Sequence, residues 1–302
     1  DRKRQHVSSE ELLAPKLADL GLLSDLPLEL CVKSTPVAVV RDILRLRGWQ
    51  GQVIHSHFSH DHFLAAAARP RQTALVRSIH APRSIRRFGP RAHAFTVPFP
   101  ALIDQLKPAP TELLPPIVDD SFRQASNRSL LRERLNLHGE PLIGMVSTFQ
   151  KSRRHEVGLE AFALVLKQRP RARLVLVGDG PEEGAILAHV RSLQIDRSVS
   201  FVGYQSSQRF VEALQCFEQV WILGLGNDFS GRAAAQARSC GVRVISVSEG
   251  GLAQFSDVVV EAQPQSVCMA ALSTDTKSVS IESRQSIAER ILNLYVTALE
   301  FV

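Results

Sequence analysis

The chain has 302 residues, which is long enough for two domains of ordinary size, each with its own hydrophobic core. Its 44% hydrophobic and 22% charged residues are typical of a soluble globular protein. No apolar run reaches the length of about 18 residues that a transmembrane helix needs, and no signal peptide is recognisable, so the sequence predicts a cytoplasmic protein. Because the chain begins with Asp1 rather than Met, we expect that an N-terminal piece is missing.

The cysteines are scattered and form no CxxC pair. This pattern predicts reduced, mostly buried thiols rather than disulfides or a zinc site. They are Cys31, Cys216, Cys240 and Cys268.

The net charge of +6 is unevenly distributed, since Arg69–Arg91 contains seven arginines and no acidic residue. One interpretation is a solvated basic face. The other is a surface for phosphate or anionic lipid, which would place the protein at the inner face of a membrane. Nucleic acid is not expected as a partner, because no aromatic-rich basic strand or DNA-binding motif accompanies the arginines.

Apolar strands alternate with helical periods through the first part of the chain, and this predicts βαβ units around a parallel sheet. Ser59 is the expected N-cap of one of these helices. The predicted strands are Leu28–Val32, Gln52–His55, Ala74–Ile79, Ala94–Val97 and Glu112–Leu114, and the predicted helices are Pro36–Leu46, Ser59–Ala68 and Ala101–Leu106.

Leu113–Asn127 is rich in proline and polar residues and is the expected domain boundary. A second alternating series follows it. Its predicted strands are Leu142–Ser147, Arg173–Val177, Val199–Val202, Val220–Leu223, Val242–Val247 and Asp257–Val260, with helices at Glu156–Lys167, Glu182–Leu193 and Ser207–Phe217. The last helix, Ser280–Phe301, carries an apolar stripe of Ile287, Ile291, Leu294, Tyr295 and Leu299.

The predicted fold class is therefore α/β, with two doubly wound Rossmann-like domains and a closing C-terminal helix. The expected divisions are residues 1–118, 119–279 and 280–302. Ligands of such sheets bind at the carboxyl ends of the strands, so the sequence predicts a site in the cleft between the two domains.

The stretch Gly224–Gly251 is the part of the sequence most suggestive of chemistry. Asp228 precedes a helix that runs to Ser239, and Gln236 lies further along the same helix. A carboxylate beside a helix N-terminus suits a ligand with hydroxyls at one end and phosphates at the other. Alternatively, Asp228 only caps the helix.

The second series resembles the donor domain of the family 4 glycosyltransferases, which are retaining enzymes of the GT-B fold that use nucleotide sugars. The resemblance rests on GEPLIGMVSTFQKSRRHEVGLEAFALVL, RARLVLVGDGPEEGAI, VSFVGYQSS, the Asp228–Gln236 segment and the following Ser239–Val244. PPIVDDSF resembles the family's interdomain linker, and HSHFSHDHFLAAA and LVRSIHAPRS resemble its N-domain strand ends.

Several positions depart from the family pattern. Thr148 occupies the slot of a phosphate-binding arginine and Arg153 that of the partner lysine. Asp228 and Gln236 replace the two glutamates of the family's glutamate–seven residues–glutamate segment. The family's first strand and Gly-rich loop have no counterpart before Leu28.

The resemblance implies roles for individual residues. Arg153, assisted by Lys151 or Arg154, would neutralise the donor diphosphate, since charge stabilisation of the leaving group dominates this chemistry. His80 would face the sugar and acceptor, and Asp228 the transferred sugar. The remaining expected contacts of the donor are Gly178, Gly180, Gly203, Tyr204, Gln236 and Glu249. Alternatively, Glu249-Gly250-Gly251 is a plain turn and the basic residues form a solvated loop.

A rival hypothesis is a zinc hydrolase built on His55, His57, His60 and His62. The register of its H-x-H-x-D-H pattern fails, because Ser59 occupies the aspartate position. Strand-end and helix-start histidines are the favoured interpretation.

The sequence as a whole predicts a retaining hexosyltransferase that needs no metal or other cofactor. Its expected acceptor is a glycan, such as a lipid-linked or surface-polysaccharide intermediate. The alternative is a non-catalytic protein that binds sugar nucleotides, suggested by Thr148, Gln236 and the absent first strand.

Overall fold

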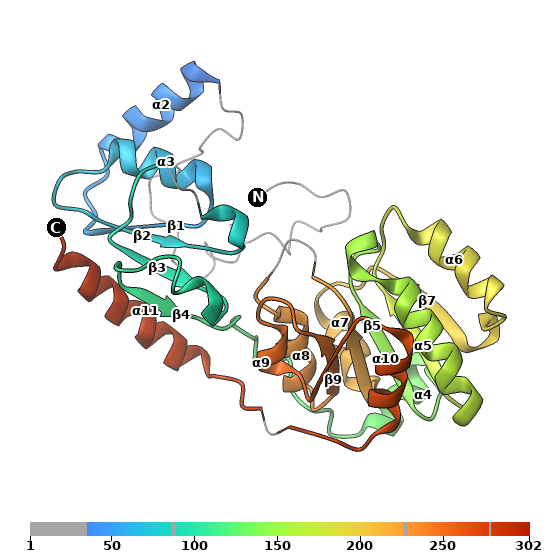
Figure 1. The fold of residues 1–302 in the computed structure, drawn as a ribbon. Helices are drawn as coiled ribbons and strands as arrows, with labels where there is room; N and C mark the ends of the chain where they lie inside the picture. Colours follow the sequence, from blue (N-terminus) through green and yellow to red (C-terminus); the bar gives the residue numbers. More distant parts are fainter. Residues whose placement is uncertain (1–34, 86–88, 226–228, 278) are drawn as a thin grey trace.

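The computed structural model describes residues 35–85, 89–225, 229–277 and 279–302. Two parallel β-sheets, each covered by helices on both faces, form two Rossmann-like domains that lie side by side (Figure 1). The predicted α/β class and GT-B architecture are confirmed. The predicted strand Leu28–Val32 lies outside the described residues.

The N-terminal domain contains a parallel sheet whose strands follow one another in the order β1-β2-β3-β4. Strand β2 is buried along its whole length, as expected for an inner strand covered on both faces. The strands are β1 (Val53–Ser56), β2 (Ala74–Ser78), β3 (Ala94–Val97) and β4 (Thr111–Leu113).

Helices from opposite ends of the described chain cover the two faces of this sheet. Ala74 and Val76 of β2 pack against Leu294 of the last helix, whereas Leu75 packs against Ala65 of α3. This alternation follows from the two-residue repeat of a strand. Helix α2 packs on α3 as an outer layer (Figure 1). The helices are α2 (Pro36–Arg47), α3 (Ser59–Ala68) and α11 (Arg284–Leu299).

Two local predictions for this domain are wrong. The N-cap position of α3 is Phe58, and the Asp61 carboxylate accepts from the backbone N–H groups of His57 and Phe58, while the Ser59 hydroxyl accepts from Arg77. The predicted helix Ala101–Leu106 is reduced to a 3₁₀ turn, Pro100–Leu102, followed by further turns, because the nearby Pro108 prevents a longer helix.

The C-terminal domain contains a six-stranded parallel sheet in the order β10-β9-β8-β5-β6-β7. The chain winds outward from β5 through β6 and β7, then returns to β8 and winds outward in the other direction. The sheet is thus doubly wound, with its switch point between β5 and β8. The strands are β5 (Leu142–Val146), β6 (Arg173–Val177), β7 (Val199–Gly203), β8 (Gln219–Ile222), β9 (Arg243–Val247) and β10 (Val258–Val260).

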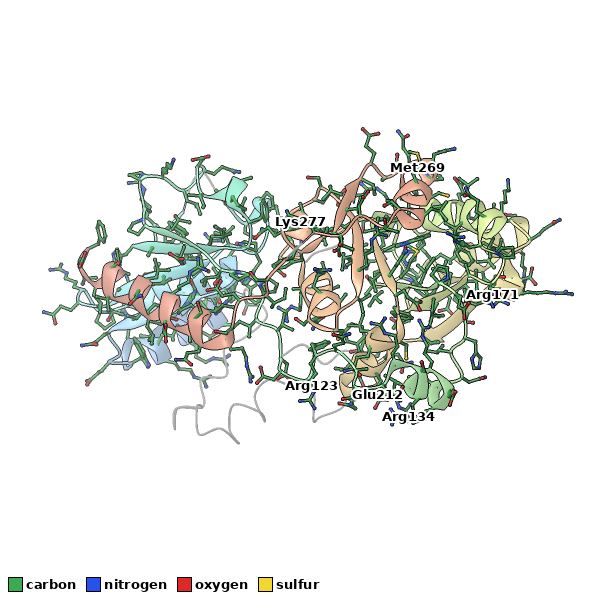
Figure 2. All side chains as sticks on the ribbon, turned by 90° about the horizontal axis from the view of Figure 1, so that it is seen from below. Arg123, Arg134, Arg171, Glu212, Met269 and Lys277 are labelled. Atoms are coloured by element: carbon green, nitrogen blue, oxygen red, sulfur yellow. The ribbon has the colours of Figure 1, made fainter. Side chains whose placement is uncertain are left out.

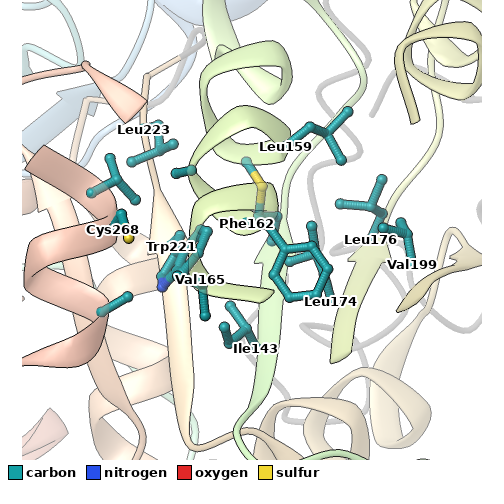
Figure 3. Packing of buried hydrophobic residues seen from close by; sticks show 14 of the residues in the cluster. Ile143, Leu159, Phe162, Val165, Leu174, Leu176, Val199, Trp221, Leu223 and Cys268 are labelled. Atoms are coloured by element: carbon teal, nitrogen blue, oxygen red, sulfur yellow. The ribbon is translucent and has the colours of Figure 1, made fainter. Parts of the chain in front are cut away.

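Helices on both faces of this sheet build two cores. On one face Phe162 of α5 packs near Leu174 of the sheet, and Trp221 lies between α5 and Cys268 of α10 (Figure 3). On the other face three alanines of α8 let that helix approach the sheet closely, beside Phe217. The helices are α4 (Arg128–Leu135), α5 (His155–Gln168), α6 (Glu183–Ser192), α7 (Ser207–Cys216), α8 (Arg232–Ser239), α9 (Leu252–Phe255) and α10 (Pro264–Leu272).

Helix α4 was not expected from the sequence, because its residues are strongly polar. Leu131 and Leu135 pack against the core of the domain, and local and surface contacts add to this packing. The Asn127 side chain accepts from Leu130 N at 3.0 Å as the N-cap. Arg134 pairs with Glu212 of α7 at 2.8 Å, and the two side chains lie close together at the surface in Figure 2.

The last helix is bonded to the N-terminal domain and to the linker. The Arg290 guanidinium pairs with Glu112 of β4 and with Glu282, and it also donates to the Leu113 carbonyl. Arg284 pairs with Asp120 of the linker. Because its apolar side also packs on β2 and β3, α11 belongs in space to the N-terminal domain, although in sequence it follows the C-terminal one.

The described cysteines are free and buried, as the sequence predicts. Burial raises the pKa of Cys216 to about 11 and that of Cys240 to about 12, so both remain thiols at neutral pH. None of the helices in the described part of the chain combines the length and apolar character that crossing a membrane requires.

Candidate functional site

The predicted basic loop lies at the switch point of the C-terminal sheet. It leaves the carboxyl end of β5 as a 3₁₀ turn, Lys151–Arg153, and then passes through Arg154, whose φ of 53° is left-handed. Arg153 Nη1 donates to the Gly224 carbonyl at 3.2 Å, just beyond β8. The loops after β5 and β8 therefore meet where ligands bind in doubly wound sheets.

Glycines allow this close meeting of loops. A Cβ on Gly224 would lie 2.0 Å from the Ser152 carbonyl oxygen. Gly178 and Gly180 press against the same basic loop in the same way, since their Cβ atoms would lie 2.0 Å from Ser147 O and 2.5 Å from Phe149 O. The two glycines after β6 thus have a structural reason to be glycine, independent of any ligand.

Glu249 follows β9 at the same edge of the sheet. Its carboxylate pairs with Arg154 Nη1 at 2.7 Å and accepts from the Leu225 backbone N–H at 3.0 Å. The Arg154 guanidinium also donates to the Leu223 carbonyl at 2.6 Å. The loops after β5, β8 and β9 therefore converge on a single ion pair.

The predicted sugar-facing residue, Asp228, lies outside the described residues together with Gly226 and Asn227. Helix α8 begins at Arg232, and its N-cap position is Gly231, with a left-handed φ of 76°. The N-cap residue of α8 is therefore Gly231 and not Asp228. Gln236 is half-buried within α8.

The other predicted donor contacts lie at neighbouring strand ends. Strand β7 ends at Gly203, whose φ of 69° is left-handed, and Tyr204 beyond it is 48% exposed. Thr148, in the slot of the family's arginine, is exposed. These positions share the carboxyl edge of the sheet with the basic loop.

A row of histidines occupies the carboxyl edge of the N-terminal sheet. His80 follows β2, and its Nε2 lies 3.4 Å from Nδ1 of His57. The His57 ring stacks on the ring of His55, with centroids 4.7 Å apart. His55 is hydrogen-bonded to Tyr295 of α11 at 2.7 Å and to Ser78 at 2.9 Å. The sequence assigned Tyr295 only to an apolar stripe, because no local pattern signals a partner 240 residues away.

The half-buried His55 and the buried His155 are neutral at physiological pH. Burial, reinforced by the charges of His57 and His80, lowers the pKa of His55 to about 4. Burial, reinforced by Arg153, likewise lowers the pKa of His155 to about 4. His155 begins α5 and is hydrogen-bonded to the Ser147 hydroxyl at 3.1 Å, so it supports the basic loop from beneath.

The geometry disfavours the zinc alternative. Both ring nitrogens of His55 are engaged by Tyr295 and Ser78. Those of His62 are engaged by the Ser56 hydroxyl and the Pro90 carbonyl. Within the described ranges, no group of three or more His, Cys, Asp or Glu side chains could hold a metal ion.

The stretch Arg69–Arg91 is not a single basic patch. Arg77 is buried in β2, where its guanidinium donates to the Ser59 hydroxyl and the Ser84 carbonyl. Arg69 donates to the Thr73 carbonyl at 2.8 Å. The arginines exposed in this stretch are Arg71, Arg83 and Arg91, while Arg86 and Arg87 lie outside the described residues.

The carboxyl edges of the two sheets face each other. Ile79, the residue before His80, is buried in a cluster with Phe99, and Phe229 of the C-terminal domain packs against this cluster. The rings of Phe99 and Phe229 are 6.4 Å apart between centroids. Gln254 of α9 donates to the Pro98 carbonyl beyond β3. The histidine row and the basic loop thus line opposing edges.

Two Rossmann-like domains with facing carboxyl edges define a protein of the GT-B class. Residues 127–268 match the family described as "Glycosyl transferases group 1". The resemblance to family 4 glycosyltransferases of the GT-B fold is therefore confirmed.

Curated relatives agree with this family. The chain is 33% identical over 113 residues to the N-acetyl-alpha-D-glucosaminyl L-malate synthase of Bacillus anthracis, covering 37% of this chain and 29% of the relative. It is 25% identical over 165 residues to the D-inositol 3-phosphate glycosyltransferase of Segniliparus rotundus, covering 51% of this chain and 36% of the relative. These matches span only about a third of the relatives' length.

Solved structures share the fold over most of the chain. Anabaena HepE in complex with UDP and glucose superposes with a TM-score of 0.64 at 15% identity, covering 87% of this chain and 74% of HepE. A glycosyltransferase from Rickettsia africae superposes with a TM-score of 0.69 at 14% identity, covering 95% and 85% of the two chains. At these identities the likeness establishes the fold alone.

Proposed function

We propose that this protein is a retaining glycosyltransferase that moves a hexose-like sugar from a nucleoside-diphosphate sugar to an acceptor held by the N-terminal domain. The observation that carries the proposal is the facing of two carboxyl edges, one with the basic loop Lys151–Arg154 and the other with His80. The structurally similar HepE has been crystallised with UDP and with UDP-glucose. UDP is therefore the first donor product to test.

The chemistry requires charge stabilisation of a leaving diphosphate. The bond between the sugar's anomeric carbon and the diphosphate oxygen breaks, and the acceptor hydroxyl oxygen bonds to that carbon on the same face. Negative charge then grows on the diphosphate, where Arg153 and Lys151 stabilise it. Asp228 would hold the sugar, and His80 would hydrogen-bond its hydroxyls or help to move the acceptor proton. Basic side chains take the place of a metal ion in this scheme, so no cofactor is proposed.

The binding step is testable by isothermal titration of the full chain with UDP and GDP. We expect binding in the micromolar range, and the absence of binding by both nucleotides below millimolar concentration would contradict the donor site. Asp228→Ala is expected to abolish transfer with a nearly unchanged melting temperature. Asp275→Ala, at an exposed carboxylate, serves as its control.

A second candidate function is binding of a sugar nucleotide without turnover. The exposed Thr148 and the neutral Gln236, at positions where the family carries charged residues, favour it. UDP binding with neither hydrolysis nor transfer of UDP-sugars, even when an extended N-terminus is supplied, would select this alternative.

The acceptor is proposed to be a glycan or lipid-linked intermediate at an anionic membrane surface on the cytoplasmic side, in polysaccharide biosynthesis. The exposed Arg71, Arg83 and Arg91 support this proposal. Sedimentation with vesicles containing anionic lipid should decrease as salt rises, because the attraction between surface charges is screened. Arg71→Gln with Arg91→Gln should weaken it, and sedimentation insensitive to salt would contradict the proposal.

A further inference from the structure

The ion pair between Arg154 and Glu249 engages one guanidinium nitrogen and both carboxylate oxygens within the protein. One nitrogen of the guanidinium, Nη1, contacts both the Leu223 carbonyl at 2.6 Å and the Glu249 carboxylate at 2.7 Å. The other oxygen of that carboxylate accepts from the Leu225 N–H at 3.0 Å. Both side chains are about one-third exposed, at 35% and 33%.

The ion pair fixes the chain on one side of the Asp228 stretch. Leu223 and Leu225 are each bonded to a member of the pair, and Gly224 between them lies against the Ser152 carbonyl. A short run of backbone beyond β8 is thus held from both the β5 loop and the β9 loop.

The turn that carries Glu249 also fixes the chain on the other side. Gly251 N donates to the Phe229 carbonyl at 2.8 Å. A Cβ on Gly250 would lie 2.6 Å from that same carbonyl oxygen. The turn Glu249–Gly251 therefore holds Leu225 and Phe229, the two described residues that flank residues 226–228.

We propose that Arg154 and Glu249 are positioning residues, whose ion pair fixes Leu223–Leu225 and, through the turn that carries Glu249, Phe229, without contacting the nucleotide. This inference rests on the proposed function and deepens it. It divides the predicted basic cluster: Lys151 and Arg153 stay the proposed contacts of the donor diphosphate, whereas Arg154, which forms the ion pair with Glu249, is assigned to holding the β8 loop. It likewise removes Glu249 from the ligand contacts and gives it a role in loop geometry.

Nucleotide binding distinguishes positioning from phosphate contact. Titrations with UDP and UMP compare wild type, Arg154→Gln, Glu249→Gln, the double variant and Lys151→Gln. We expect each single variant of the pair to lose about tenfold in affinity for both nucleotides alike. The double variant should bind the nucleotides no more weakly than either single variant, because each of the three variants removes the same ion pair. Lys151→Gln should weaken UDP more than UMP, because it removes a contact with the diphosphate.

Hydrogen exchange gives a readout that is independent of nucleotide. The amides of residues 223–231 should exchange faster in Arg154→Gln and Glu249→Gln than in wild type, and at the wild-type rate in Lys151→Gln. Circular dichroism melting verifies that each variant is folded. Arg154→Lys and Glu249→Asp, which keep the charges, should restore part of the protection.

Specific outcomes would overturn the inference. If Arg154→Gln weakens UDP far more than UMP while Glu249→Gln leaves both unchanged, Arg154 contacts phosphate. Unchanged exchange of residues 223–231 in both variants would show that the pair does not hold the loop. If wild type binds neither UDP nor GDP, the proposed function fails, whereas the exchange measurement still decides on the role of the ion pair.

Discussion

Tyr295 and His55 are 240 residues apart in the chain, yet the Tyr295 hydroxyl lies 2.7 Å from Nδ1 of His55. The hydrogen bond links the C-terminal helix to the edge of the N-terminal sheet on which His57 and His80 also lie. Because the second nitrogen of His55 is bonded to Ser78, the ring is held in a fixed orientation beneath the His57 ring. The last helix thus contributes to the proposed acceptor side.

Replacing Tyr295 with phenylalanine removes this hydrogen bond and leaves a half-buried imidazole nitrogen unpaired. We expect a loss of about 1–2 kcal/mol in the free energy of unfolding and a lower transfer rate. Thermal or urea unfolding measures the change in the free energy of unfolding. Leu292→Ala, at a side chain of the same helix that is 59% exposed, should change stability little and serves as the control.

Gly224→Ala should disrupt the meeting of the β5 and β8 loops, since its Cβ would lie 2.0 Å from a backbone oxygen that cannot move alone. We expect destabilisation of about 2–3 kcal/mol and weaker nucleotide binding. Gly184→Ala is the matched control, because no atom lies within 4 Å of its added Cβ within α6. The control should be neutral or stabilising by about 0.5–1 kcal/mol, and equal effects of the two changes would contradict the packing argument.

Asp257 is fully buried and accepts from Arg238 at 2.6 and 2.8 Å, as well as from the backbone N–H of Val244. Asp257→Asn leaves the guanidinium without its counter-charge, at an expected cost of about 3–5 kcal/mol. Calorimetric melting measures it. Asp275→Asn, at an exposed carboxylate, should melt like wild type. A melting temperature of Asp257→Asn within a degree or so of wild type would refute the structural role.

Stability should fall as the pH is lowered from neutrality towards 4. The folded-state pKa values of His55 and His155 are about 4, below the unfolded value of 6.5. The unfolded chain therefore binds more protons in this window, and the stability contributed above pH 6.5 is lost on acidification, by roughly 2 kcal/mol for each histidine between pH 7.5 and 5. His155→Asn should reduce the drop in melting temperature between pH 7.5 and 5. The exposed His138→Asn should leave the drop unchanged.

Regular elements were predictable where burial follows a simple repeat. The strand Arg173–Val177 is continuously apolar and buried on both faces, and α5 carries a clear apolar face, so both could be placed from the sequence. Helix α4 could not, because its apolar repeat is short, only Leu131 and Leu135 packing on the core, and Asn127 and ion pairs supply the remaining contacts. The bounds of α3 were predicted correctly but its cap was not, because Asp61 and not Ser59 accepts from the backbone N–H groups just before the helix.

The site was predictable only in part for a similar reason. Strand ends are local features, so Arg153 and His80 could be placed at carboxyl edges of their sheets. Whether a charged side chain there meets a ligand or another protein group depends on contacts between distant loops. The pairing of Arg154 with Glu249, and the burial of Arg77 within a run of arginines, have no local signal in the sequence.

Glu112 and Arg290, which pair across 178 residues, also constrain how the protein is made. Synthesis proceeds from the N-terminus, so β1–β4 leave the ribosome long before the helix that covers Ala74, Val76 and Ala94 exists. The C-terminal domain can complete both of its cores while that apolar face of the first sheet is still bare. Nascent chains halted before residue 284 should therefore expose this face of the N-terminal sheet to chaperones. The domain synthesised first is thus the one that finishes folding last.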